Sequence, residues 1–276
     1  MNIIDGKSIA AQMRAELKEK IERAEKKPGL AVVIVGEDPA SQIYVRNKIK
    51  ACAEVGIRSY SYELPANATQ TEVETLLKTL GEDTTVDGIL LQLPLPAHLD
   101  TESATVCIPV EKDVDGFSAT HLGQLLLHKE EIVACTPLGI MKLLEKSGVD
   151  LTGKHAVVIG RSETVGKPMA ALLLNANATV TICHSKTRDL KGICRQADVL
   201  VAAVGKAKFV TEDMVKEGAI VIDVGMNRDE NGKLCGDVDF ANVQAKTSYI
   251  TPVPGGVGPM TITMLMYNTC LAAWRE

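Results

Sequence analysis

Tyr44 and Lys48 stand four residues apart in ASQIYVRNKIKACAEVG (40–56), a segment whose apolar spacing predicts a helix. Residues at that spacing share one helix face, so the phenol and the ammonium group would lie close together. A partly desolvated lysine can exchange protons near neutral pH, and a tyrosine can orient a ring or act as an acid. A tyrosine over a lysine stem is also common on ordinary helix surfaces, so the pair alone leaves both interpretations open.

Gln92 and Asp115 are two further candidates, in a predicted strand end and a predicted turn. Gln92 closes the apolar strand VDGILLQL (86–93), where ligand-binding groups lie in open α/β sheets, although an amide there can also be a simple cap. Asp115 belongs to EKDVDGF, which predicts a turn with Asp113 and Asp115 as turn formers beside Gly116. A calcium loop is excluded because the further ligands and the closing glutamate are absent.

Gly160 and Gly166 frame GRSETVGKP (160–168), which lies between the predicted strand HAVVIG and an apolar helical stretch. In a dinucleotide-binding turn, the first glycine leaves the strand tightly and a later one lets the helix pack closely, while pyrophosphate meets helix N–H groups. The middle glycine of the usual fingerprint is missing, and Arg161 and Ser162 stand there instead. The motif alone leaves a cofactor loop and a plain strand-to-helix turn equally open.

The segment HSKTR (184–188) follows the next predicted strand and contains no acidic residue. NAD-selective enzymes place an Asp or Glu there for the ribose 2′-hydroxyl, and a carboxylate would repel a 2′-phosphate. Ser185 and Lys186, together with Arg161, would bind such a phosphate, although each residue singly could belong to a solvated loop. Taken together, they favour NADP over NAD.

Later strands also end in glycine. Gly205 in VGK and Gly225 in DVGMN would let the backbone approach a cofactor, or would form simple turns. TPVPGGVGPMT (251–261) joins a strand to the last helix but lacks the GK[ST] of a Walker loop. It would bring bare backbone close to a flat ligand or to another domain.

Predicted strands and helices alternate along the chain in two blocks. The first reads β-α-β-α-β, with one helix ended by Gly56 and another begun by a Thr71–Glu74 capping box. The second spans 136–225 and includes a short helix at 211–218. Continuous Val/Ile strands in such alternation are typical of parallel sheets covered on both faces. We predict two α/β domains with a cleft between them, the second a Rossmann-like doubly wound parallel sheet.

Composition narrows the possible partners and the compartment. The chain has 276 residues, 46% apolar and 24% charged, with a net charge of −5 and scattered Lys and Arg, so we expect no nucleic-acid or membrane partner. Its seven cysteines include no CxxC pair, which argues against a disulfide framework and against a zinc or other metal site. The N-terminus lacks the pattern of a signal peptide, and we expect a cytoplasmic protein.

Segments along nearly the whole chain resemble, in the same order, those of the bifunctional methylenetetrahydrofolate dehydrogenase/methenyltetrahydrofolate cyclohydrolases, the FolD family. Several of them are long and specific. They are ASQIYVRNKIKACAEVGI, DGILLQLPLP, KDVDGF, TPLGIMKLL, VVIGRSETVGKP, HSKT, ADVLVAAVGK, VIDVGMN, GDVDF and TPVPGGVGPMT.

The resemblance implies a role for each candidate in folate binding and catalysis. Lys48 would be the principal catalytic residue, and Gln92 would hydrogen-bond it and tune it. Tyr44 would stack on the folate and Asp115 would anchor the pterin, which completes the catalytic set. The folate cleft would be lined by Pro254 and Gly255.

The resemblance also implies which residues would bind NADP. Gly160, Arg161 and Ser162 would hold its phosphates together with Ser185, and Met226 would meet the nicotinamide end. The glycines at the other strand and loop ends complete this set: Gly166, Gly205 and Gly225. Two departures from the family pattern stand out: Met226 replaces a frequent isoleucine, and Glu163 with Thr164 fills the loop, where an acid suits phosphate only if it points to solvent.

The implied function is oxidation of 5,10-methylenetetrahydrofolate with NADP, followed by hydrolysis of the methenyl product to 10-formyltetrahydrofolate, in one-carbon metabolism and purine biosynthesis. The implied assembly is a homodimer. We assign residues 1–135 with 256–276 to a folate-binding catalytic domain and 136–255 to an NADP-binding domain.

The residues by themselves leave two other functions open. Another NADP-dependent oxidoreductase could act on a carbonyl, with Tyr44 or Lys48 as the acid. A non-catalytic NADP-sensing or scaffold protein is the other, which the presence of Lys48 and Asp115 disfavours.

Overall fold

A computed structural model describes residues 2–275, with the side chain of Ala40 left aside. The chain forms two compact units. The six-stranded unit contains residues 2–11 and Thr136–Thr261, and the three-stranded unit contains Gln12–Cys135 and residues 262–275. Within the described residues, no helix combines the length and the apolarity needed to cross a membrane.

The boundaries of these units differ from the expected domain limits at the two ends of the chain. The break after Cys135 coincides with the expected one, but residues 2–11 and 256–261 belong to the six-stranded unit. At the N-terminal end the reason is backbone pairing: Asn2 and Ile3 form strand β1 (Asn2–Ile3), which pairs in parallel with Tyr249 and Ile250. A strand of two residues has no periodicity that a sequence could reveal.

The six-stranded sheet is parallel throughout, with the order β1-β11-β8-β7-β5-β6. Its strands are largely uninterrupted runs of apolar residues, which suits a sheet covered on both faces. The strand order reverses between β5 and β7, the place where ligands bind in doubly wound sheets. The predicted doubly wound parallel sheet is confirmed. Its other strands are β5 (His155–Ile159), β6 (Thr179–Cys183), β7 (Val199–Ala202), β8 (Ala219–Asp223) and β11 (Thr247–Ile250).

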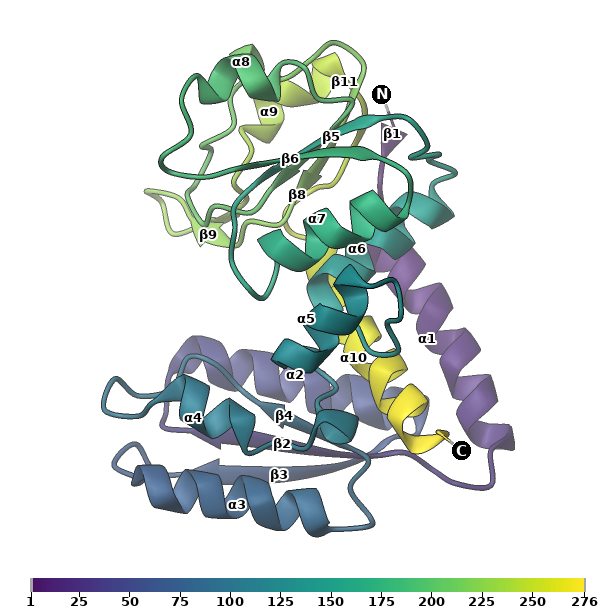
Figure 1. Ribbon diagram of the computed structural model, residues 1–276, viewed down its shortest axis with the longest axis vertical. Helices are drawn as coiled ribbons and strands as arrows, with labels where there is room; N and C mark the ends of the chain where they lie inside the picture. Colours follow the sequence, from purple (N-terminus) through teal and green to yellow (C-terminus); the bar gives the residue numbers. More distant parts are fainter. Residues whose placement is uncertain (1, 276) are drawn as a thin grey trace. The chain divides into compact units, whose positions relative to one another are not determined.

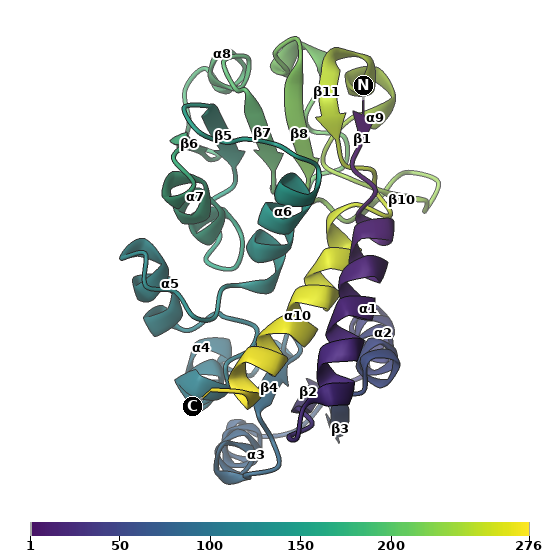
Figure 2. The same ribbon diagram turned by 90° about the vertical axis from the view of Figure 1, so that its right-hand side faces the viewer.

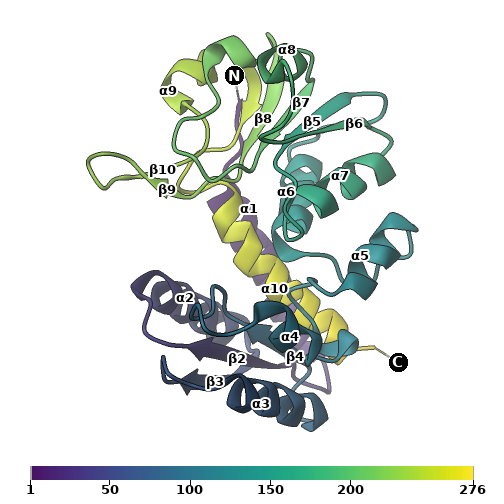
Figure 3. The same cartoon turned by 60° about the vertical axis from the view of Figure 1, so that its left-hand side comes forward.

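Helices cover both faces of this sheet. On one face, α8 (Leu190–Cys194) and α9 (Phe240–Val243) contribute Cys194 and Val243 to a buried cluster with the strands. The other face carries α6 (Cys135–Lys146) and α7 (Gly166–Asn175), as Figure 3 shows. The predicted helix at 211–218 is only a 3-10 turn, η2 (Glu212–Met214). The unit is completed by η3 (Gln244–Lys246) and the short hairpin of β9 (Asn227–Arg228) and β10 (Leu234–Cys235).

The three-stranded unit has a parallel sheet of order β3-β2-β4, built from β2 (Gly29–Val35), β3 (Arg58–Leu64) and β4 (Gly88–Leu91). Helices α2 (Pro39–Val55) and α3 (Gln70–Glu82) lie on opposite faces of it (Figure 1). The predicted β-α-β-α-β order of this region is confirmed. The remaining elements are α4 (Thr101–Val106), η1 (Val110–Lys112) and α5 (Ala119–Leu126).

Two long helices from opposite ends of the chain contribute most of their length to this unit. They are α1 (Gly6–Arg23) and α10 (Val257–Ala273), which run side by side (Figure 2). The guanidinium of Arg14 donates to the hydroxyl of Thr263 at 3.1 Å, which ties one helix to the other. Segments from the two ends of the chain are therefore joined within this unit.

The helix caps explain where α2 ends and where α3 begins. Gly56 ends α2 in the left-handed conformation at φ +91°, as predicted. The predicted Thr71–Glu74 capping box is wrong, because α3 begins at Gln70 with Thr69 and Glu72 forming the reciprocal bonds. Both pairs have the Thr-x-x-Glu spacing, so spacing alone could not choose between them.

Candidate active site

Lys48 and Gln92 are joined by a hydrogen bond in the three-stranded unit. Lys48 lies on α2 and is only 9% exposed, and its Nζ donates to Gln92 Oε1 at 3.1 Å. Gln92 follows β4, where its backbone N–H donates to Val33 O and its Nε2 donates to Leu93 O at 2.7 Å. Since the amide nitrogen is already engaged, the amide oxygen is oriented toward the lysine.

Tyr44 precedes Lys48 by one turn of α2 and is half-buried. Burial raises the pKa of the Tyr44 hydroxyl above its ordinary value of 10.0, so it is a neutral phenol at physiological pH. A neutral, partly covered ring can stack on a flat ligand while it keeps a polar edge.

Asp115 lies close enough to Lys48 for the ammonium charge to affect the pKa of its carboxyl. Burial raises the pKa of the Asp115 carboxyl, and the Lys48 ammonium offsets part of that rise. The backbone oxygen of Asp115 accepts a hydrogen bond from Cys135 N–H at 3.4 Å. The structure thus brings Lys48, Gln92 and Asp115 together from α2, the end of β4 and the turn at 113–116.

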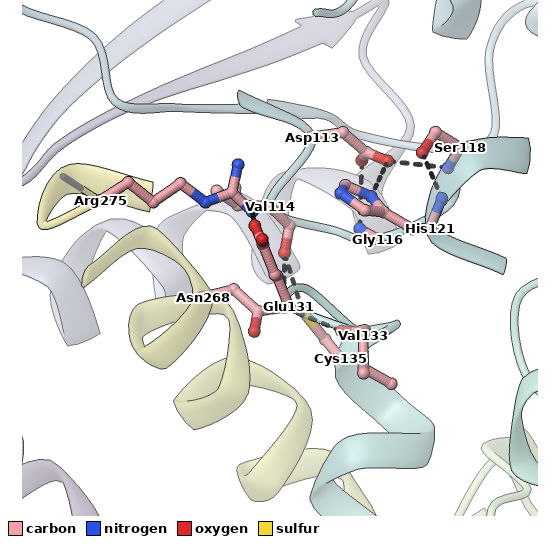
Figure 4. A network of polar contacts seen from close by, with 10 residues as sticks. All are labelled: Asp113, Val114, Gly116, Ser118, His121, Glu131, Val133, Cys135, Asn268 and Arg275. Carbon is pink, nitrogen blue, oxygen red and sulfur yellow. Dashed lines mark hydrogen bonds and ion pairs between the residues drawn. The ribbon is translucent and has the colours of Figure 1, made fainter. Parts of the chain in front are cut away.

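Asp113 stabilises the 113–116 turn (Figure 4), to which Asp115 belongs. Its carboxylate accepts hydrogen bonds from the backbone N–H groups of Gly116 and Ser118 and lies 3.1 Å from His121 Nδ1. Burial alone would raise the pKa of the Asp113 carboxyl, but the bonds from His121 and Ser118 hold that pKa below its ordinary value. Asp113 is therefore the predicted turn former. Its buried partner His121 was not anticipated.

Asn268 on α10 supports the same turn from the other side (Figure 4). Its Nδ2 donates to Val114 O and to Val133 O, both at 2.9 Å. The side chain is fully buried. Val114 is the neighbour of Asp115, so Asn268 holds the backbone of the 113–116 turn against the segment that enters α6. No sequence motif indicated this contact, because 154 residues separate Asn268 from Val114.

Gly160 and Gly166 are required by close backbone contacts in the six-stranded unit. A Cβ on Gly160, at φ +130°, would lie 2.2 Å from Ala203 O, and one on Gly166 would lie 2.3 Å from Gly160 O. Gly160 follows β5 and Ala203 follows β7, so this contact lies at the point where the strand order reverses. The loop therefore has the tight turn and the close helix start that dinucleotide binding requires.

Ser162 and Glu163 stabilise this loop in different ways. The hydroxyl of Ser162 accepts from the backbone N–H groups of Val165 and Gly166, both at 3.2 Å. The carboxylate of Glu163 pairs with Lys167 at 2.8 Å and is 79% exposed, so its charge is turned to solvent and neutralised. The acid in the loop is therefore compatible with phosphate binding.

The exposed side chains of Arg161 and Ser185 follow the neighbouring strands β5 and β6. Gly205 and Gly225 follow β7 and β8, and Met226 is 48% exposed. A Cβ on Gly205, at φ +67°, would meet nothing within 4 Å, so this glycine is required by its backbone conformation. These candidates thus lie at the carboxyl ends of adjacent strands.

Pro254 and Gly255 lie in the turn that precedes α10 in the six-stranded unit. The Val253–Pro254 bond is cis, and Gly255 has φ +105°. Gly255 O accepts a hydrogen bond from Lys7 N–H at 3.0 Å, which ties this turn to the start of α1.

Residues 4–115 match the model of the tetrahydrofolate dehydrogenase/cyclohydrolase catalytic domain, and residues 134–276 match that of its NAD(P)-binding domain. Two relatives named bifunctional protein FolD are similar over 99% of this chain. The one from Campylobacter curvus is 58% identical over 96% of its own length, and the one from Moorella thermoacetica is 57% identical over 99%.

Solved structures agree with these matches. The bifunctional enzyme FolD of Campylobacter jejuni is 52% identical with a TM-score of 0.97, covering 99% of this chain and 98% of its own. The Trypanosoma brucei methylenetetrahydrofolate dehydrogenase-cyclohydrolase, complexed with NADP and an inhibitor, is 42% identical with a TM-score of 0.93, covering 98% and 96%. The chain therefore belongs to the tetrahydrofolate dehydrogenase/cyclohydrolase family.

Proposed function

We propose that Lys48, Gln92, Asp115 and Tyr44 form the catalytic set of a bifunctional enzyme of one-carbon folate metabolism. As a member of its family, the chain oxidises 5,10-methylenetetrahydrofolate to 5,10-methenyltetrahydrofolate with NADP and then hydrolyses the product to 10-formyltetrahydrofolate. The observation that supports these residue roles is the bond from buried Lys48 to Gln92 beside Asp115.

The oxidation step needs binding and orientation more than acid–base chemistry. Loss of a hydride from the carbon between N5 and N10 leaves a cation that the nitrogen lone pairs stabilise, so no strong base is required. We assign stacking of the folate ring to Tyr44 and anchoring of the pterin to the carboxylate of Asp115. Pro254 and Gly255 complete the proposed folate-binding set.

The hydrolysis step needs proton transfers, which Lys48 is suited to provide. Water adds to the methenyl carbon and loses a proton, and the bond from that carbon to N5 then breaks as N5 takes up a proton, which leaves a formyl group on N10. Lys48 is covered by protein and held by an amide oxygen. We propose that its nitrogen relays these protons and that Gln92 keeps it in place.

The six-stranded unit has the features that NADP requires. Gly160 and Gly166 have no side chain at their close backbone contacts, and the loop lies at the N-terminus of α7, where the helix dipole places a partial positive charge that favours phosphate. When bound, NADP supplies the hydride acceptor. We assign its phosphates to Gly160, Arg161, Ser162 and Ser185, and its nicotinamide end to the turns of Gly205, Gly225 and Met226.

One assay tests both activities and the cofactor. The protein is mixed with methylenetetrahydrofolate and either NADP or NAD, and the absorbance of the methenyl product is followed as it forms and decays. We expect formation with NADP followed by decay. If the methenyl product accumulates without decay, the hydrolase activity is refuted. If no methenyl product forms with either nucleotide, the oxidation is refuted.

We further propose a cytoplasmic homodimer whose formyl product serves purine biosynthesis. The free thiols of the seven cysteines suit a reducing compartment. Strand β6 is an edge of its sheet, and Ile182 on it and Leu174 on α7 are 41% and 60% exposed, which supports pairing with a second copy. Sedimentation of I182K tests this, since a lysine on the edge should produce monomers while an unchanged mass would discount this surface.

A further inference from the structure

Asp237 and Asp223 are two buried carboxylates that have no place in the residue roles above. Asp237 is fully buried and Asp223 is 2% exposed. Burying a carboxylate is strongly unfavourable unless hydrogen bonds replace those it made with water. Both carboxylates accept several hydrogen bonds, mostly from backbone N–H groups, and these bonds fix the segments that carry the donors.

Asp237 binds the turn that follows β7. Its Oδ2 accepts from the backbone N–H groups of Val204 at 2.6 Å and Gly205 at 3.0 Å, and its Oδ1 accepts from that of Lys206 at 2.9 Å. Oδ1 also accepts from the side-chain amide of Asn227 at 2.9 Å, just after β8. One carboxylate therefore holds three consecutive N–H groups of one turn and a side chain of the next.

Asp223 holds Asp237 in turn. Its Oδ1 accepts from the backbone N–H groups of Gly225 at 2.9 Å and Asp237 at 2.8 Å, and its Oδ2 accepts from that of Val238 at 2.9 Å. The two carboxylates act in series: Asp223 fixes the backbone of Asp237, and the side chain of Asp237 fixes the turn after β7.

Two glycines make room for these carboxylates. A Cβ on Gly225 would lie 2.3 Å from Asp237 Oδ1, and one on Gly236 would lie 1.8 Å from Asp223 Oδ2. Gly225 is therefore required by the neighbouring carboxylate, independently of any ligand. This explains DVGMN and GDVDF as two parts of one hydrogen-bonded arrangement.

We propose that Asp237 is a positioning residue for the nicotinamide end of NADP. It does so by holding the turns at 204–206 and 225–227 in one arrangement. The inference rests on the proposed assignment of Gly205, Gly225 and Met226 to that end of the cofactor. A carboxylate is suited to this role because its two oxygens can accept four hydrogen bonds, whereas an amide would direct two of its own hydrogens at the same donors.

The test is the variant Asp237→Asn, measured in two ways. The dissociation constant for NADP is determined by calorimetry, and cyclohydrolase activity is assayed on methenyltetrahydrofolate without any nucleotide. We expect NADP binding to weaken by about tenfold or more, which is the loss of one or two charge-assisted hydrogen bonds. We expect kcat and KM of the cyclohydrolase to stay within about twofold of the unaltered protein, since the three-stranded unit is untouched.

Asp239→Asn is the matched control. Asp239 lies two residues away, and its Oδ2 accepts from the Asn242 side chain at 2.6 Å. The Asp239→Asn variant should therefore leave the dissociation constant for NADP unchanged. Asn227→Ala is a milder second variant that removes one donor to Asp237 and leaves the backbone bonds, so it should weaken NADP binding by a smaller factor.

The outcomes separate this role from its alternatives. An unchanged dissociation constant for NADP in folded D237N would overturn the proposal. Equal losses of both enzyme activities with NADP affinity retained would also overturn it, because they would indicate a merely structural role. If D237N does not fold, an unchanged constant in N227A overturns it. Failure of the unaltered protein to bind NADP would instead refute the proposed function, and this role with it.

Discussion

The Nζ of Lys48 donates to Gln92 Oε1 at 3.1 Å, and Gln92 is held in turn because its Nε2 donates to Leu93 O. The lysine is thus restrained by a neutral acceptor at the end of a strand. Gln92 holds the nitrogen in place without adding a second negative charge to that of Asp115. Such an arrangement suits a group that must exchange protons with a bound substrate.

Replacement of Lys48 by methionine should abolish the cyclohydrolase activity while NADP binding survives. The chain length and packing are kept, but the proton-transferring nitrogen is lost, which typically costs about 10²- to 10⁴-fold in rate. Steady-state hydrolysis of methenyltetrahydrofolate and calorimetric titration with NADP give the two measurements. Lys50→Met is the control, because Lys50 is exposed on the same helix. Near-normal hydrolysis in K48M would remove Lys48 from this role.

Replacement of Asp115 by alanine should raise the KM for folate steeply, because the pterin anchor is lost. The acid limb of the pH profile provides a second readout. Burial raises the pKa of Asp115, so the ionised anchor is lost as the pH falls through a value above the ordinary 3.8. The KM should therefore rise on acidification in the unaltered protein and stay flat over the same range in D115N. An unchanged KM in D115A would leave Asp115 only a part of the turn.

Replacement of Asn268 by leucine should raise the KM for folate and lower stability by about 2 kcal/mol, since Val114 O and Val133 O each lose a buried donor. Thr269→Val is the matched control, because Thr269 is equally buried on α10 but its hydroxyl bonds only Leu265 O of the same helix. Urea unfolding and folate kinetics of both variants decide the matter. A KM that changes as little in N268L as in T269V would contradict the support of the Asp115 turn.

Simultaneous replacement of Arg161 and Ser185 by alanine should weaken NADP binding far more than NAD binding. Both side chains are exposed at neighbouring strand ends and would contact the 2′-phosphate. Glu163→Gln is the comparison, because Glu163 pairs with Lys167 in solvent, and its neutralisation should change either constant by less than about threefold. Equal losses of affinity for NADP and for NAD in the double variant would refute the 2′-phosphate assignment.

The side chain of Asp223 should titrate near pH 6, well above the ordinary range of an aspartate. Burial raises its pKa to about 6, although three backbone N–H groups counteract that rise. The folded protein thus holds this proton more tightly than the unfolded chain, so the contribution of Asp223 to stability falls as the pH rises from about 4 to about 6. A ¹³C NMR titration of the aspartate carboxyls, assigned by comparison with D223N, measures it. Titration below pH 4 would show that the N–H donors outweigh burial.

Local patterns were sufficient for much of this protein. The apolar runs and their alternation with helices predicted the parallel sheets, and the Tyr44–Lys48 spacing predicted a shared helix face. These features depend on residues close together in the chain, whose periodicity follows from the geometry of helices and strands. The capping box of α3 shows the limit of such patterns, since two pairs fitted and only the start of the helix selected Thr69 and Glu72.

Long-range contacts were decided by the tertiary structure alone. The pairing of Asn2 and Ile3 with β11, the support of Val114 by Asn268, and the hold of Asp237 on the turn after β7 join residues from 31 to more than 200 positions apart. Gly225 shows the difference at a single residue: the sequence indicated a glycine at a strand end, but only the fold reveals that the Asp237 carboxylate occupies the space of its missing side chain. A hydrogen bond between distant residues leaves no period or spacing in the chain, because its geometry exists only after the elements have packed.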